Sequence, residues 1–88
     1  MRAPSIPLAK RFVAATDLCE QAYDVETNTE AKYRLARAAF LFGQMAEYLE
    51  RRNSMTSAIT TRCNKAIGLI GDDALRRKIR LLISDETS

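Results

Sequence analysis

Residues 35–49 of the chain read LARAAFLFGQMAEYL, and the spacing of their apolar side chains decides the fold. Apolar residues recur at intervals of three and four, which is the period of a helix with one face turned toward a core. The stretch therefore predicts a helix that lies against other helices. The members of this apolar stripe are Leu35, Ala38, Phe42, Met45 and Leu49.

The same stretch carries apolar side chains outside the stripe, namely Phe40, Leu41 and Tyr48. A helix with so much apolar surface is either the middle helix of its domain or is partly covered by another chain. The first alternative needs two neighbouring helices. The second predicts a docking surface or self-association, and the functional hypothesis below depends on it.

Composition favours helix over the whole chain of 88 residues. Thirteen alanines and nine leucines stand against two valines, two prolines and three glycines. Alanine and leucine are strong helix formers, and no window alternates apolar and polar residues as a strand does. We therefore predict an all-α chain with a single helical-bundle domain over residues 1–88. A chain of this length buries a small core, so oligomer formation would help to stabilise it.

Local signals divide the chain into helices. After an extended lead-in at 1–6, with Ser5 as a plausible N-cap, a first helix is expected from Leu8 to about Asp24. Thr27 and Glu30 have the spacing of a capping box and predict the start of a second helix, which runs from about 28 to 52. Residues 53–54 form a weaker break, at which Asn53 or Ser54 would cap a third helix.

The third helix is expected to run from about 54 to 70, with Met55 facing inward, and Gly71 fits the position after its end. Asp72 or Asp73 would then cap a short fourth helix, and residues 84–88 read as a disordered tail. Short connections favour antiparallel neighbours. We therefore predict a small antiparallel bundle of three long helices and one short C-terminal helix.

The residue types present exclude most catalytic mechanisms. The chain has no histidine, so it lacks histidine-based catalytic pairs and histidine metal ligands. No glycine-rich phosphate loop is present. The acidic row at 17, 20 and 24 reads as a solvated face or a partner for arginines rather than a metal site. We expect no enzyme, no cofactor and no metal.

Cysteine usage and hydropathy suggest a compartment. Cys19 and Cys63 form no metal or redox motif and fall on apolar stripes, where cysteine is a small buried side chain. No signal peptide is recognisable, and the longest apolar run, 38–42, is too short to span a bilayer. We expect a cytoplasmic protein with reduced thiols and no membrane contact.

Charge is separated along the chain. Residues 17–30 hold five acidic and no basic side chains, whereas 51–80 hold eight basic and two acidic ones. The acidic first helix would either lie beside basic helices of its own bundle, so that the charges cancel, or leave a basic face for an anionic partner.

The hypothesis for function is a non-enzymatic interaction protein, such as an adaptor, an inhibitor or an accessory subunit. It would dock on a protein partner through the second helix, and a homo-oligomer is plausible. The expected contact residues are Arg37, Phe40, Leu41, Tyr48 and Arg51. The alternative is nucleic-acid binding through a basic surface on the third and fourth helices. Its residues would be Arg62, Lys65, Arg76, Arg77, Lys78 and Arg80.

Overall fold

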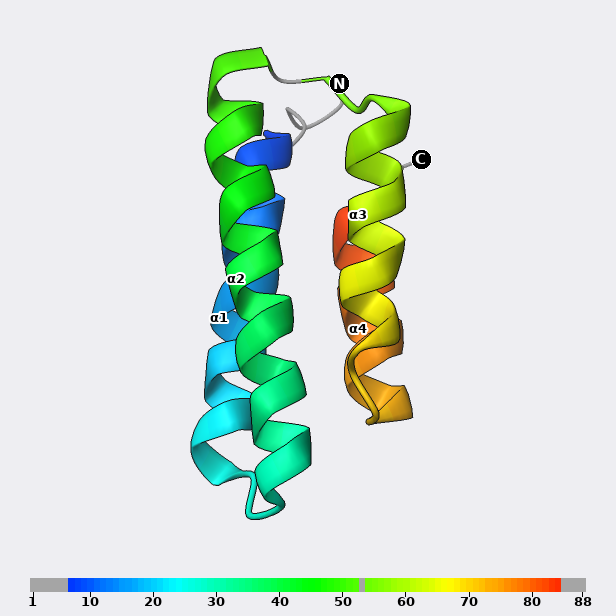
Figure 1. Cartoon of the computed structure of the whole chain (residues 1–88). Coiled ribbons are helices and arrows are strands. Elements are labelled where there is room, and N and C mark those ends of the chain that lie inside the picture. Colours follow the sequence, from blue (N-terminus) through cyan, green and yellow to red (C-terminus); the bar gives the residue numbers. More distant parts are fainter. Residues whose placement is uncertain (1–6, 53, 85–88) are drawn as a thin grey trace, which may run out of the picture.

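The computed structural model describes residues 7–52 and 54–84, and over these ranges it contains four helices and no strand (Figure 1). The all-α prediction is therefore confirmed. In this described part, no helix has the length and hydropathy that a bilayer crossing requires. The helices are α1 (Leu8–Val25), α2 (Thr29–Arg52), α3 (Ser57–Gly68) and α4 (Asp73–Ile83).

The helices associate in two pairs (Figure 1). Helices α1 and α2 lie side by side along most of their length and share the largest contact in the molecule. Helices α3 and α4 form the second pair, in which α3 packs on α2 and α4 packs on α1. One side of the α1–α2 pair is therefore covered, and no helix of residues 7–52 or 54–84 packs on its opposite side.

Buried apolar side chains from all four helices form one core. Phe12 and Phe42 are fully buried and meet edge to face, with ring centroids 6.1 Å apart. The predicted stripe of α2 lies in this core, from Leu35 to Leu49. No polar or charged residue of the described ranges is buried in it, so apolar burial is the dominant stabilising term.

Helix α2 begins one residue later than a cap at Thr27 implies. The cap is Asn28, whose side-chain oxygen accepts a hydrogen bond from the backbone N–H of Ala31 at 2.9 Å. The backbone N–H of Asn28 in turn donates to the Glu26 carboxylate at 3.0 Å. The predicted Thr27–Glu30 capping box is therefore wrong, because an asparagine cap satisfies the third N–H of the helix directly.

Helix α3 is shorter than expected. Thr56 caps it, because its hydroxyl accepts from the backbone N–H of Ile59 at 3.2 Å while its own backbone is extended. Ser54 therefore does not cap the helix, and Met55 precedes it and is exposed rather than inward-facing. With 12 and 11 residues, α3 and α4 are both short, against 18 and 24 for α1 and α2.

The turn between α3 and α4 is fixed by side-chain hydrogen bonds. The Asp72 carboxylate accepts from the backbone N–H groups of Ala74 and Leu75, at 2.8 and 3.2 Å, so Asp72 is the N-cap of α4. Helix α3 already ends at Gly68 with Leu69 as its C-cap, and Gly71 lies beyond that end. The expected C′ role of Gly71 is therefore wrong.

Two predictions fall on residues outside the described ranges. These are the extended lead-in at 1–6, with the proposed cap Ser5, and residues 85–88 of the expected tail at 84–88; Ser84 itself is the C-cap of α4. Asn53 also lies outside them. Pro7 precedes α1, and its carbonyl accepts from the backbone N–H groups of Lys10 and Arg11.

Candidate interaction surfaces

The apolar residues predicted outside the α2 stripe have two different environments. Phe40 is 58% exposed, whereas Leu41 and Tyr48 are half-buried and pack against the core. The guanidinium of Arg52 lies over the Tyr48 ring, 5.8 Å from its centroid. The chain thus covers much of Leu41 and Tyr48 by itself, and Phe40 remains as the main exposed apolar group of the three.

Helical spacing explains this division. Successive residues of a helix point about 100° apart, so Phe40 and Leu41 lie on different stripes. Tyr33 precedes Phe40 by seven residues, which places both on one stripe, and Tyr33 is 69% exposed. Arg37 and Arg51 are exposed as well. Sequence reasoning missed Tyr33, although its spacing from Phe40 was a usable signal.

A cavity of about 530 Å³ lies beside Phe40, and we call it the α1–α2 groove. Small side chains allow it to form, because Ala36 and Ala39 leave space that larger residues would fill. Helices α1 and α2 also approach closely here, since the Thr16 hydroxyl lies 3.5 Å from the carbonyl oxygen of Ala39. The groove is lined mainly by Glu20, Tyr23 and Asp24 of α1 and by Ala36, Ala39 and Phe40 of α2.

One end of the groove is held by contacts between the two helices. The Lys32 ammonium lies over the Tyr23 ring, 4.0 Å from its centroid, and donates to the backbone carbonyl of Tyr23 at 3.1 Å. A cation in this position stabilises the ring by electrostatic attraction to its face. These contacts stabilise Tyr23 in the wall of the groove.

The acidic side chains of α1 have no ionic partner among the described residues. Asp17, Glu20 and Asp24 are exposed, and none of them forms a salt bridge within residues 7–52 and 54–84. The two salt bridges in these ranges join Arg34 to Glu30 and Arg76 to Asp73, each inside one helix. Direct ion pairs between acidic α1 and basic α4 are thus absent from the described part.

Most cations of α3 and α4 also form no salt bridge in the described ranges. Arg76 is the exception, because it pairs with Asp73 and donates to the carbonyl of Ile70 at 3.2 Å, which holds the α3–α4 turn. The remaining five are exposed and form no salt bridge in the described ranges. They are Arg62, Lys65, Arg77, Lys78 and Arg80.

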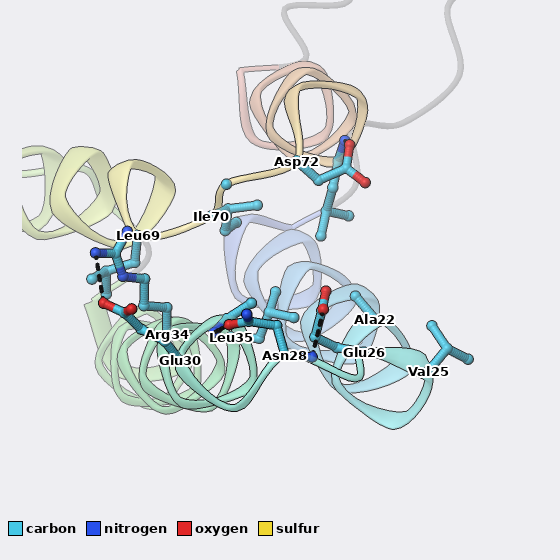
Figure 2. Close-up of a pocket in the computed structure, with 13 residues that line it drawn as sticks. Ala22, Val25, Glu26, Asn28, Glu30, Arg34, Leu35, Leu69, Ile70 and Asp72 are labelled. Atoms are coloured by element: carbon cyan, nitrogen blue, oxygen red, sulfur yellow. Dashed lines mark hydrogen bonds and ion pairs between the residues drawn. The ribbon is translucent and has the colours of Figure 1, made fainter.

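A second cavity, of about 540 Å³, lies where the α1–α2 loop meets the α3–α4 turn (Figure 2). Its polar side chains already have partners. Arg34 pairs with Glu30, Glu26 accepts from the backbone of Asn28, and Asp72 caps α4. Because these groups are engaged in local structure, this cleft shows no converging set of free groups that would hold a small molecule.

The described residues also show little reactive chemistry. They contain no group of three or more histidine, cysteine or carboxylate side chains that could hold a metal ion. Cys19 and Cys63 are free and buried. Burial raises the pKa of the Cys19 thiol to about 11, and burial also raises the pKa of Cys63. Both thiols are therefore protonated at neutral pH and poor nucleophiles.

No protein-family model matches this chain, and no curated protein or solved structure matches it either.

Proposed function

We propose that the chain is a non-enzymatic interaction protein that docks on a protein partner through the exposed aromatic stripe of α2. In this proposal residues 1–88 form one domain, an antiparallel bundle, which acts in the cytoplasm as an adaptor, inhibitor or accessory subunit. Phe40 is the observation that carries the proposal. It is 58% exposed and lies between Tyr33 on its own stripe and the α1–α2 groove.

The exposed part of Phe40 is large enough to anchor an interface. A phenylalanine buries about 200 Å² when it is fully covered, so the 58% that remains exposed leaves about 120 Å² for a partner. Full burial of a phenylalanine is worth about 1.5–3 kcal/mol, so covering this exposed part contributes about 0.9–1.7 kcal/mol. Only a minority of interface residues contribute more than about 1 kcal/mol. Arg37 and Arg51 would flank the stripe and orient the partner.

Site-specific photo-crosslinking tests the proposal. A benzophenone amino acid at position 40 is compared, in cells of the source organism, with the same residue at Thr61, which is exposed on α3. We expect a discrete crosslinked protein from position 40 only. This partner protein should bind the Phe40→Ala variant at least tenfold more weakly than it binds the wild type. Equal crosslinking from both positions, or an affinity that Phe40→Ala does not change, would refute the proposal.

Nucleic-acid binding is the second candidate, because five exposed cations on α3 and α4 form no salt bridge in the described ranges. Phosphate contacts make binding salt-dependent, with a slope of about −0.9 per neutralised phosphate in a plot of log affinity against log salt. Replacing Arg77 and Arg80 by Gln should then flatten the slope by about 1.8. This candidate is refuted if the slope is the same for the wild type and the variant. It is also refuted if neither DNA nor RNA binds the wild type at low salt.

A further inference from the structure

Helix α4 carries an apolar side chain between cations on its solvent side. Leu81 is 68% exposed. Arg77 and Lys78 precede it by four and three residues, are exposed, and form no salt bridge in the part of the chain that the structure describes. Residues at these spacings are neighbours on a helix surface. We call Leu81, Arg77 and Lys78 the α4 knob.

The α1–α2 groove has the complementary character. Its apolar surface comes from Ala36, Ala39 and Phe40, and its carboxylates are Glu20 and Asp24. An inserted leucine would cover apolar area that is now in contact with water, while each cation of the knob could meet one of the carboxylates. Opposite charges around an apolar contact also fix its register and disfavour other partners.

Groove and knob do not meet within one chain. Helix α4 packs on α1 and α3 and makes no contact with α2, whereas the groove lies between α1 and α2. Glu20, Asp24 and Phe40 of the groove and all three knob residues are exposed, and the two features lie on different helices.

We propose that the α1–α2 groove of one copy takes the α4 knob of a second copy. This inference rests on the proposed function, since it names the partner of the Phe40 surface as a second copy of this chain. Because groove and knob are different surfaces, the contact is heterologous: in a bound pair, one copy keeps a free knob and the other keeps a free groove. Such contacts build rings or open chains rather than closed dimers.

Sedimentation analysis of paired charge reversals tests the inference. In the groove variant, Glu20→Lys and Asp24→Lys give a positive groove, which repels the knob. In the knob variant, Arg77→Glu and Lys78→Glu give a negative knob, which repels the groove. Each variant alone is expected to be monomeric at about 1 mM protein, a concentration at which a contact with a Kd of about 1 mM is still populated. An equimolar mixture should associate again, because both cross-contacts then join opposite charges.

Matched controls separate these effects from net charge and from loss of folding. Arg62→Glu with Lys65→Glu changes the charge by the same amount as the knob variant, but on α3, and should associate like the wild type. Leu81→Ala should weaken association at least tenfold, whereas Val25→Ala, which shortens another exposed apolar side chain, should not. All variants alter exposed residues and should keep the helical circular dichroism spectrum.

Three results would overturn the inference. They are a wild type that stays monomeric at about 1 mM, a knob variant that associates like the wild type, and association that disappears on nuclease treatment. The last would mean that nucleic acid bridges the copies. If the wild type is monomeric, this inference fails, but position 40 can still crosslink to a different protein. Failure of this inference is therefore distinguishable from failure of the proposed function.

Discussion

Phe40 and Phe42 are two residues apart on α2, and shortening each to alanine should have very different effects on stability. Phe42 is fully buried and packs edge to face on Phe12, whereas Phe40 is 58% exposed. Removing a buried phenylalanine typically costs about 3–5 kcal/mol, because apolar contacts are lost and a cavity remains. The loss for Phe42→Ala is large against a total stability of about 4–13 kcal/mol for a chain of this length.

The expected cost of Phe40→Ala follows from its exposure. Full burial of a phenylalanine is worth about 1.5–3 kcal/mol. Since Phe40 is 58% exposed, the remaining contact is worth about 0.6–1.3 kcal/mol. Alanine also has a higher helix propensity than phenylalanine, which returns about 0.5 kcal/mol. The net destabilisation should therefore stay below about 1 kcal/mol.

Urea unfolding, followed by circular dichroism at low protein concentration, measures both variants. With a denaturant slope of about 2 kcal/mol per molar urea, Phe42→Ala should lower the unfolding midpoint by about 2 M and Phe40→Ala by less than about 0.5 M. Equal shifts, or a larger shift for Phe40→Ala, would show that Phe40 belongs to the core and would remove the exposed aromatic surface on which the proposed function depends.

Three further predictions concern a cap, a ring and a thiol. Asp72→Ala should lower the free energy of unfolding by about 1 kcal/mol in urea titrations, because two backbone N–H groups lose their acceptor, and Asp73→Ala by less. Tyr48→Ala should cost about 1–2 kcal/mol in the same assay, because Tyr48 packs against the core. For Cys19, burial raises the thiol pKa from 9.0 to about 11, so its contribution to stability is complete below pH 9.0 and is lost as the pH rises toward 11. Between pH 9 and 11, the free energy of unfolding of the Cys19→Ala variant should therefore fall less steeply than that of the wild type.

Hydropathy periodicity was sufficient to predict the long helices. The ends of α1 and α2 agree with the sequence prediction to within one residue, because a stripe such as Leu35 to Leu49 marks the buried face and therefore the helix itself. The start of α3 was harder to predict. Asn53, Ser54 and Thr56 are all common N-cap residues, and the cap is decided by which side chain reaches the third N–H of the helix. Sequence alone does not show that distance.

The candidate site was only partly visible in the sequence. Phe40 was predicted as an exposed anchor together with Leu41 and Tyr48, but whether a neighbouring helix covers a side chain depends on how the helices pair. The same applies to the groove, since Ala36 and Ala39 read as ordinary small residues until α1 lies against them. Tertiary packing thus determines which apolar residues remain for a partner.

The orientation of α1 decides which helices its carboxylates meet. Packing α4 on α1 brings a basic helix next to an acidic one, which would allow their charges to cancel within the chain. In the described ranges the carboxylates of Glu20 and Asp24 instead line the groove shared with α2, and Arg77 and Lys78 are exposed on α4. The carboxylates of the groove and the cations of the knob are therefore both exposed; Phe40 lines the same groove, and Leu81 belongs to the knob. In the proposed self-association, the knob of one copy covers the groove of the next, so both surfaces of a copy are covered only when it has a neighbour on each side.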